Sequence, residues 1–125
     1  GMTPQQALIA ATSIAGELLP GQSILDLVAE LHPTPAVGGF PRQAALEAIR
    51  HTEKLDRGWY AAPLGWIGAS GHGEFAVALR SALIDGSQAR LFAGCGIVAD
   101  SDPQIEFAES WLKFQVMLRA LGNRK

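Results

Sequence analysis

The sequence predicts an α+β domain in which an antiparallel sheet is packed with helices. Three segments show strand patterns, at about residues 60–69, 74–84 and 88–98, with short turn signals between them. Asp85-Gly86 is a strong hairpin signal between the second and third segments, so the strands are expected to form a meander. A helix start at Asp102-Pro103 follows them. Residues 1–125 are expected to form a single domain with a modest core.

The N-terminal part of the chain mixes strand and helix signals. Residues 7–19 contain alanines, which favour helix, together with β-branched residues and a glycine, and we expect a strand there, the fourth of the sheet. Pro20-Gly21 then predicts a turn. Ser23 is placed to cap a short helix over residues 24–31.

A proline-rich segment separates this helix from the next. Three prolines and two glycines in residues 32–41 exclude regular structure, because they break either kind of hydrogen-bond ladder. Pro41 then opens a helix over residues 42–55, with Ala45, Leu46 and Ile49 on its inner face.

Apolar side chains alternate along the second predicted strand. One face carries Phe75, Val77, Leu79 and Leu83, and the other carries mainly alanines. Arg80 stands on the alanine face, where its guanidinium can reach a carboxylate in a bidentate fork. The alternative is an arginine at the rim of the sheet with a buried stem.

The last helix carries an acidic stripe. Glu106, Glu109 and Lys113 share one face, because offsets of three, four and seven residues fall together on a helix. Apolar side chains flank the stripe on both sides, which indicates an ion site, whereas the alternative is an ordinary pair between Glu109 and Lys113. The core is expected to include the three tryptophans, Trp59, Trp66 and Trp111.

Composition excludes several classes of function. The formal net charge of -2 and the charged fraction of 18% give no basic footprint for nucleic acid. The single cysteine excludes an internal disulfide and fits a cytoplasmic protein. No apolar run is long enough to span a membrane, and no signal peptide opens the chain. Gly1 is interpreted as a scar from tag removal and Met2 as the natural start.

Residues of the last predicted strand and helix, like Arg80, are suited to bind an anionic ligand. Gly94 and Gly96 can offer backbone N–H groups to an anion. Glu106 and Glu109 are hard oxygen ligands at a spacing suited to one Mg²⁺. Together these residues predict a site for a small polycarboxylate that is held partly through magnesium.

Five short motifs follow one another along the chain. They are residues 31–41 (Leu-His-Pro-Thr-Pro-Ala-Val-Gly-Gly-Phe-Pro), 57–60 (Arg-Gly-Trp-Tyr), 78–81 (Ala-Leu-Arg-Ser), 93–98 (Ala-Gly-Cys-Gly-Ile-Val) and 106–113. In this order and spacing the chain resembles the C-terminal part of the chorismate-utilising enzymes. The His-Pro-Thr-Pro-Ala-Val form is similar to isochorismate synthases rather than to anthranilate or aminodeoxychorismate synthases.

The resemblance implies a magnesium-dependent isomerisation of chorismate to isochorismate, which would serve menaquinone or siderophore biosynthesis. Glu109 would be a direct Mg²⁺ ligand, and Glu106 would help directly or through water. The reaction adds water at C2 and removes the C4 hydroxyl, using a lysine base, a glutamate acid and the metal.

The resemblance also implies which residues bind the chorismate-like substrate. Arg80 and Tyr60 would hold the enolpyruvyl carboxylate, and Ala36 would line the ring pocket. The full set is Ala36, Tyr60, Arg80, Gly94, Gly96 and Lys113.

The chain departs from the family in one important respect. The family's base lysine, acid glutamate and a further metal-binding glutamate lie upstream of the matched region, so no catalytic residue is assigned here. The chain therefore resembles half of a site, to be completed by a separate N-terminal half, and we expect uncovered apolar surface to drive formation of a homo-oligomer. A non-catalytic binding or interaction module, or a degenerate remnant, is the alternative function.

Overall fold

The computed structural model describes residues 14–122 and confirms the α+β class with antiparallel strands. Three helices come first: α2 (Ile24–Leu31), α3 (Pro35–Gly38) and α4 (Arg42–Thr52). Four strands follow: β1 (Pro63–Ile67), β2 (Gly73–Val77), β3 (Ser81–Asp85) and β4 (Gln88–Phe92). The longest element, α5 (Pro103–Ala120), comes last.

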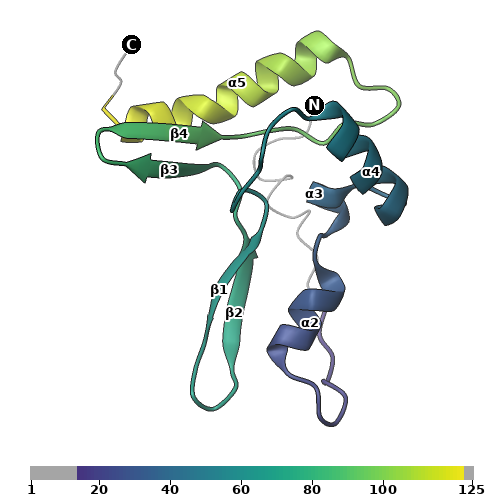
Figure 1. Cartoon of the computed structure of the whole chain (residues 1–125). Coiled ribbons are helices and arrows are strands. Elements are labelled where there is room, and N and C mark those ends of the chain that lie inside the picture. Colours follow the sequence, from purple (N-terminus) through teal and green to yellow (C-terminus); the bar gives the residue numbers. More distant parts are fainter. Residues whose placement is uncertain (1–13, 123–125) are drawn as a thin grey trace.

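The strands form two separate hairpins in place of the single three-stranded meander. Within the described part of the chain, β1 pairs only with β2 and β3 only with β4, both antiparallel. Figure 1 shows the β1–β2 hairpin extending away from α5, whereas the β3–β4 hairpin runs alongside that helix. α3 and α4 pack against each other on the other side of the molecule.

The first helix begins as the sequence predicts. The Ser23 hydroxyl accepts a hydrogen bond from the amide of Asp26, and the Asp26 carboxylate accepts one from the amide of Ser23 at 2.8 Å, which completes a capping box. The strand expected over residues 7–19 is absent from residues 14–19, and residues 7–13 lie outside the described part of the chain. A strand requires a partner edge, and both hairpins pair only internally within residues 14–122.

The proline-rich segment contains a short helix, α3, which the sequence analysis wrongly excluded. Pro35 occupies its first position, where the missing N–H would be unpaired in any case. The amides of Val37 and Gly38 both donate to the carbonyl of Thr34, at 3.0 and 2.8 Å. Gly39 then ends the helix with φ 73 and ψ 178, a region that is essentially reserved for glycine.

The prediction of one strand over residues 74–84 was wrong, because the chain turns at Arg80. Arg80 has φ 47, in the left-handed region, and the amide of Leu79 donates to the carbonyl of Val77 at 2.8 Å. β2 therefore ends before this turn, and β3 starts after it. The predicted alternation persists within β2, where Phe75 and Val77 are half-buried and their neighbours Glu74 and Ala76 are exposed.

The Asp85-Gly86 hairpin is confirmed. Asp85 pairs with Gln88 across the turn, and Gly86 adopts φ 56, as a two-residue hairpin turn requires. The third predicted strand, however, ends at Phe92 instead of residue 98. Residues 93–98 make no strand pairing. Gly94 and Cys95 bond to α5 instead, and Val98 bonds to Ser101 just before that helix.

Both ends of α5 match the sequence signals. The Asp102 carboxylate accepts hydrogen bonds from the amides of Gln104 and Ile105, at 2.8 and 3.0 Å. Gly122, with φ 87, follows the C-cap residue Leu121 in the left-handed conformation that commonly ends helices. None of the helices within residues 14–122 is long and apolar enough to cross a membrane.

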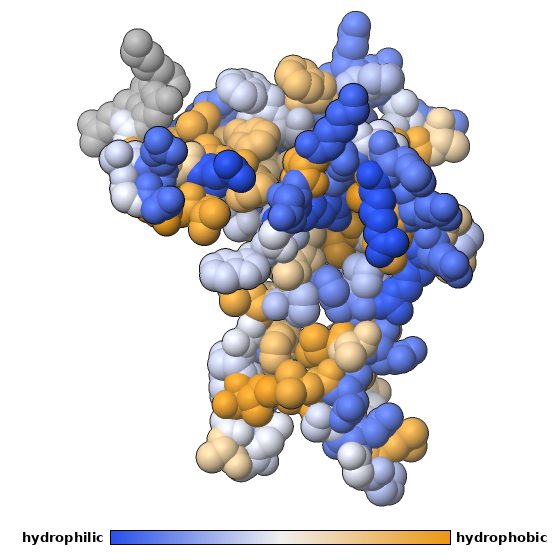
Figure 2. Space-filling view, viewed as in Figure 1, coloured by the Kyte–Doolittle hydropathy of each residue, from blue (hydrophilic) through white to orange (hydrophobic). Residues whose placement is uncertain are grey.

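Very little of the chain is buried. Among the described residues the only buried apolar side chains are Ala61 and Met117. Assignment of the tryptophans to a core was wrong, because Trp59, Trp66 and Trp111 are 84%, 53% and 57% exposed. Figure 2 shows apolar surface gathered over the part of the molecule where Figure 1 places the β1–β2 hairpin. Within residues 14–122 no element covers these side chains.

We predict that Gly39→Ala destabilises the fold by about 1–3 kcal/mol, the usual cost of such a backbone conformation for a residue with a Cβ. The added Cβ would also lie 2.5 Å from the Cβ of Ala45. Gly16→Ala is the matched control, because Gly16 has open space around its Cβ position. Urea denaturation followed by circular dichroism measures both, and equal midpoints for the two variants would contradict the prediction.

Candidate functional site

Lys113 joins α5 to the segment that follows β4. Its Nζ donates to the carbonyl of Gly94 at 2.9 Å and lies 2.6 Å from Oε1 of Glu109. The Lys113 side chain is 21% exposed and the Glu109 side chain 51%, so the lysine lies under the helix and the carboxylate lies at its edge. The i,i+4 pair therefore exists, and its lysine also fixes the position of Gly94.

Glu106 makes a second link between α5 and the same segment. Its Oε1 accepts a hydrogen bond from the hydroxyl of Ser101 at 2.6 Å, and its main-chain carbonyl accepts one from the thiol of Cys95 at 2.9 Å. Burial, followed by the hydrogen bond to Glu106, raises the pKa of Cys95 above its ordinary value. The thiol is thus protonated at neutral pH and acts as a structural donor, not as a nucleophile.

Tyr60 lies next to this cluster. Its ring stacks on Phe92 of β4, with centroids 5.6 Å apart and planes inclined by 17°. A Cβ added to Gly94 would lie 3.0 Å from the Tyr60 hydroxyl, so the glycine allows the phenol and the backbone to approach closely. Burial raises the pKa of Tyr60, whereas the positive charges of Arg57 and Lys113 oppose that shift.

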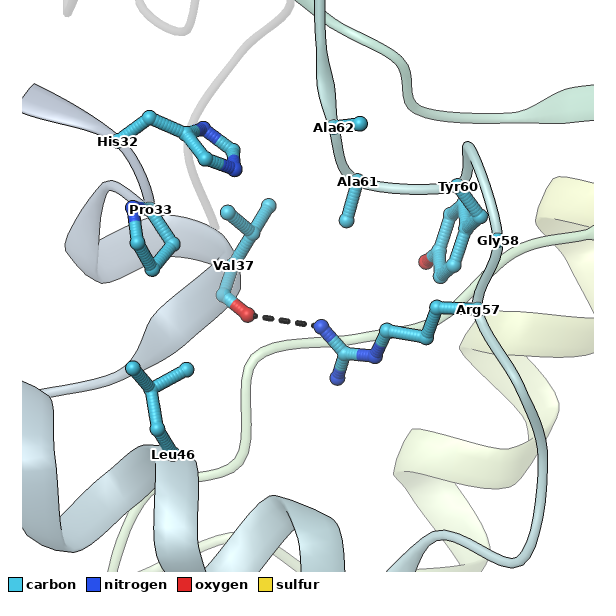
Figure 3. Close-up of a pocket in the computed structure, with 9 residues that line it drawn as sticks. All are labelled: His32, Pro33, Val37, Leu46, Arg57, Gly58, Tyr60, Ala61 and Ala62. Atoms are coloured by element: carbon cyan, nitrogen blue, oxygen red, sulfur yellow. Dashed lines mark hydrogen bonds between the residues drawn. The ribbon is translucent and has the colours of Figure 1, made fainter. Parts of the chain in front are cut away.

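A hollow of about 240 Å³ opens on the other side of Tyr60 (Figure 3). Arg57 extends into it and donates to the carbonyl of Val37 on α3 at 3.0 Å. The Arg57 guanidinium also donates two hydrogen bonds to the Glu53 carboxylate, of 2.7 and 2.5 Å. It lies 6.0 Å from the centroid of the Tyr60 ring. The hollow is lined by His32, Pro33, Val37, Leu46, Arg57, Gly58, Tyr60, Ala61 and Ala62.

Ala36, predicted to line a ring pocket, is exposed on α3 beside Val37. Its place next to the hollow keeps the ring-pocket prediction open. The helix predicted over residues 42–55 is shorter, because α4 ends at Thr52. The next residue, Glu53, is held by hydrogen bonds from Arg57, which lower the pKa of its carboxyl.

Arg80 precedes Ser81, which pairs with Phe92 of β4, two residues before Gly94. It is exposed in the link between β2 and β3, and it forms no hydrogen bond or ion pair with the described residues. The cluster under α5 thus contains Lys113, Glu109 and Glu106, with Gly94 and Tyr60 beside it. That this cluster and Arg80 bind the same ligand stays a prediction.

The two carboxylates of α5 have donor chemistry that suits Mg²⁺. One oxygen of each carboxylate is engaged by Ser101 or Lys113, and the second oxygen, Oε2, forms no hydrogen bond with the described residues. Within residues 14–122 no group of three or more His, Cys, Asp or Glu side chains lies together. Glu106 and Glu109 therefore fit part of a magnesium shell, which in such sites is commonly completed by water and substrate oxygens.

Comparison with known proteins identifies the family. The profile of the chorismate binding enzymes matches residues 10–122. The chain belongs to this family. It is 55% identical over 91% of its length to isochorismate synthase MenF of Bacillus subtilis, and 56% identical over 89% to the salicylate biosynthesis isochorismate synthase of Pseudomonas aeruginosa. DhbC of Bacillus anthracis, a crystal structure named for an isochorismate synthase, matches with a TM-score of 0.80 at 46% identity over 85% of this chain.

The chain spans only about a quarter of these relatives. The matched region covers 24% of the Bacillus subtilis protein, 23% of the Pseudomonas aeruginosa protein and 28% of the Bacillus anthracis chain. This agrees with a match to one part of a chorismate-binding domain.

Sequence reasoning missed the role of Arg57. It recognised the Arg-Gly-Trp-Tyr motif but gave the arginine no partner, although Arg57 links α3, the end of α4 and Tyr60. The spacing of four residues from Glu53 was the available signal, since this spacing favours an ion pair. The Ser101 contact with Glu106 was also missed, and no sequence pattern identifies it.

We predict that Tyr60 titrates above its ordinary pKa of about 10 in the folded chain. Tyr60 is the only tyrosine, so the absorbance of phenolate reports this side chain alone. The raised pKa contributes stability that is present below the unfolded pKa and is lost as the pH rises through the folded pKa. Lys113→Gln should raise the midpoint further, because the ammonium lowers it. A folded midpoint equal to the midpoint in denaturant would contradict the prediction.

Proposed function

We propose that the chain supplies the substrate-carboxylate and magnesium-binding part of an isochorismate synthase site. The observation that carries this proposal is the cluster of Lys113, Glu109, Gly94 and Tyr60, in a chain with over 50% identity to two isochorismate synthases. In this cluster one ammonium lies between a backbone carbonyl and a carboxylate, beside a phenol.

Each residue has a role in this proposal. Glu109 binds Mg²⁺ directly, and Glu106 binds it directly or through water. When bound, the metal neutralises the charge of the substrate carboxylate. The backbone amides of Gly94 and Gly96 form no hydrogen bond with the described residues and are free to donate to the anion. Lys113 holds Gly94 in place and supports binding.

Tyr60 and Arg80 hold the enolpyruvyl carboxylate in this proposal. Tyr60 remains a neutral hydroxyl donor at physiological pH, because burial raises its pKa. Arg80, in the exposed link between two strands, has a guanidinium with no partner among the described residues. Ala36 borders the ring of the substrate from α3. Arg57 links α3 to Tyr60, because its guanidinium donates to the Val37 carbonyl and lies near the Tyr60 ring.

The chemistry itself requires groups that the described residues do not supply. Addition of water at C2 and loss of the C4 hydroxyl need a base and an acid within hydrogen-bond reach. Glu53 is engaged by Arg57, whose hydrogen bonds lower the pKa of its carboxyl, and Lys113 is engaged by Gly94 and Glu109. The separate N-terminal half of the site would therefore supply the base, the acid and a further metal ligand. The product would serve menaquinone or siderophore biosynthesis in the cytoplasm.

A non-catalytic role is the second candidate. An interaction module that keeps affinity for anions or Mg²⁺ would use the same cluster without turnover. The two candidates differ in one measurement, because only the first predicts turnover when the rest of a chorismate-binding domain is present.

We predict that the isolated chain does not convert chorismate to isochorismate in the presence of Mg²⁺. Each missing general acid or base contributes about 10²–10⁴-fold, so the rate should stay at the uncatalysed level. When the missing half is co-expressed, turnover should appear, and Glu109→Ala should reduce it at least about 100-fold if a metal ligand is lost.

Glu47→Ala is the matched control, because Glu47 is an exposed glutamate on α4, away from the cluster. Chorismate consumption, followed by chromatography of the products, measures both variants. Turnover by the isolated chain that depends on Mg²⁺ and disappears in Glu109→Ala would show that the chain has its own acid and base.

We also predict that the isolated chain forms a homodimer or larger oligomer. Its large apolar side chains are widely exposed, and water disfavours such surface. Sedimentation velocity at micromolar concentration measures the mass, and a clean monomer of 13.2 kDa would contradict the prediction.

A further inference from the structure

Ser101 lies at the joint between two parts of the candidate site. It follows the Gly-Cys-Gly segment of residues 94–96 and directly precedes Asp102, the N-cap residue of α5. The Ser101 amide donates to the carbonyl of Val98 at 3.0 Å, and the Ser101 hydroxyl oxygen accepts from the amide of Val98 at 3.1 Å. These two reciprocal bonds close a turn over residues 98–101. The Ser101 hydroxyl is therefore fixed by the backbone that leads into the helix.

The hydroxyl hydrogen of Ser101 is directed to Glu106. A serine hydroxyl has one hydrogen and two lone pairs, and an ionised carboxylate can only accept. Because the Val98 amide is itself a donor, the hydrogen of the Ser101 hydroxyl is free for the Oε1 atom of Glu106, 2.6 Å away. This length is typical of a charge-assisted bond from a hydroxyl to a carboxylate. The direction of donation between Ser101 and Glu106 thus follows from the contacts.

Glu106 is held at two points. Its main-chain carbonyl accepts from the thiol of Cys95 at 2.9 Å, and its carboxylate accepts from Ser101 at 2.6 Å. The first contact fixes the backbone in the first turn of α5, and the second fixes the end of the side chain. A glutamate side chain loses much rotamer freedom when it is ordered. Because Ser101 has already ordered this carboxylate, less freedom remains to be lost when Glu106 binds an ion.

The partner of Glu106 also differs in charge from the partner of Glu109. The Nζ atom of Lys113 lies 2.6 Å from Oε1 of Glu109, so its ammonium competes with a metal cation for that carboxylate. The Ser101 hydroxyl is neutral, so it orients Glu106 without supplying a competing positive charge. Of the two carboxylates, Glu106 is therefore the one that is oriented and still attracts a cation with its full charge.

We infer that Ser101 is a positioning residue for the metal site and acts on Mg²⁺ through Glu106. The inference rests on the proposed function, because that proposal makes Glu106 a ligand of the metal directly or through water. The Ser101 hydroxyl holds one carboxylate oxygen and leaves the other for the ion or its water. Hydrogen bonds from such outer partners orient carboxylate ligands in metal sites and keep them ready to bind.

Metal binding by the full chain tests the inference without requiring turnover. The probe is Mn²⁺, which takes the same oxygen ligands as Mg²⁺ and whose free form is counted by electron paramagnetic resonance. Competition with Mg²⁺ checks that both ions use one site. Ser101→Ala removes the hydroxyl and should weaken Mn²⁺ binding about 10-fold, the effect expected when a partner of a metal ligand is lost. Ser101→Thr keeps a hydroxyl and should restore the affinity of the unsubstituted chain.

Ser110→Ala is the matched control. It makes the same substitution on α5, but the Ser110 hydroxyl donates to the main-chain carbonyl of Phe107 at 2.8 Å and not to a carboxylate. Its Mn²⁺ affinity should equal that of the unsubstituted chain. Circular dichroism checks that each variant keeps its helices.

A double-mutant cycle separates an effect on Glu106 from an effect on the fold. Glu106→Gln removes the charge that Ser101 orients and leaves Glu109 to bind the ion. In this background Ser101→Ala should cause no further loss of Mn²⁺ affinity, because its effect passes through the missing carboxylate. A second loss of about 10-fold would show that Ser101 only supports the turn before α5.

Three results would overturn the inference. They are equal Mn²⁺ affinity of Ser101→Ala and Ser110→Ala, a loss that Ser101→Thr shares in full, and an additive loss in the Glu106→Gln background. Failure of the proposed function has a different signature. In that case Glu109→Ala would leave the Mn²⁺ affinity unchanged, or the unsubstituted chain would bind no Mn²⁺ and the inference would fall with it. A site that responds to Glu109→Ala but not to Ser101→Ala would sink the inference alone.

Discussion

The contact between Lys113 and the backbone of Gly94 is the interaction on which the candidate site depends. It holds the chain after β4 against α5, and it places the Tyr60 hydroxyl beside the same glycine. Because β4 ends at Phe92, this segment has no strand partner to fix it in the described residues. Side chains of α5 replace the missing ladder. The helix is thus both the support of the segment and the source of the carboxylates.

This arrangement has a consequence for the helix itself. An amphipathic helix ordinarily turns its apolar side to the protein and its charged side to water. α5 follows this rule only toward its C-terminal end, where Met117 is buried. Earlier in the helix Glu106 and Lys113 are half-buried, whereas Trp111 and Leu112 are exposed. Polar groups that are buried must be paired, and here Ser101 and the Gly94 carbonyl pair them. Within the described residues, the helix thus combines paired polar contacts on its inner side with apolar side chains left in water.

Local signals in the sequence predicted the elements well. Ser23, Asp102 and Asp85-Gly86 act on neighbouring atoms, so their effects appear whatever the rest of the fold does. The wrong predictions concerned features that depend on contacts with distant parts of the chain. A strand over residues 74–84 looks continuous by alternation, and only the backbone at Arg80 divides it. Aromatic residues such as Trp111 indicate burial, but within residues 14–122 no surface covers that side chain. The candidate site shows the same difference. The helical spacing of Glu106, Glu109 and Lys113 predicted their shared face on α5, whereas the hydrogen bond between Arg57 and Val37 appears only in the folded chain.

Solvent exposure limits how strongly the carboxylates of α5 can act. The Glu109 side chain is 51% exposed, so solvent screens its charge and weakens its attraction for a metal ion. The N-terminal half of the site in the proposed function would exclude water from the neighbourhood of that carboxylate. The same step would bring the groups that move protons into reach. Binding affinity and catalysis should then both rise on assembly, because covering the helix lowers the dielectric constant around its carboxylates.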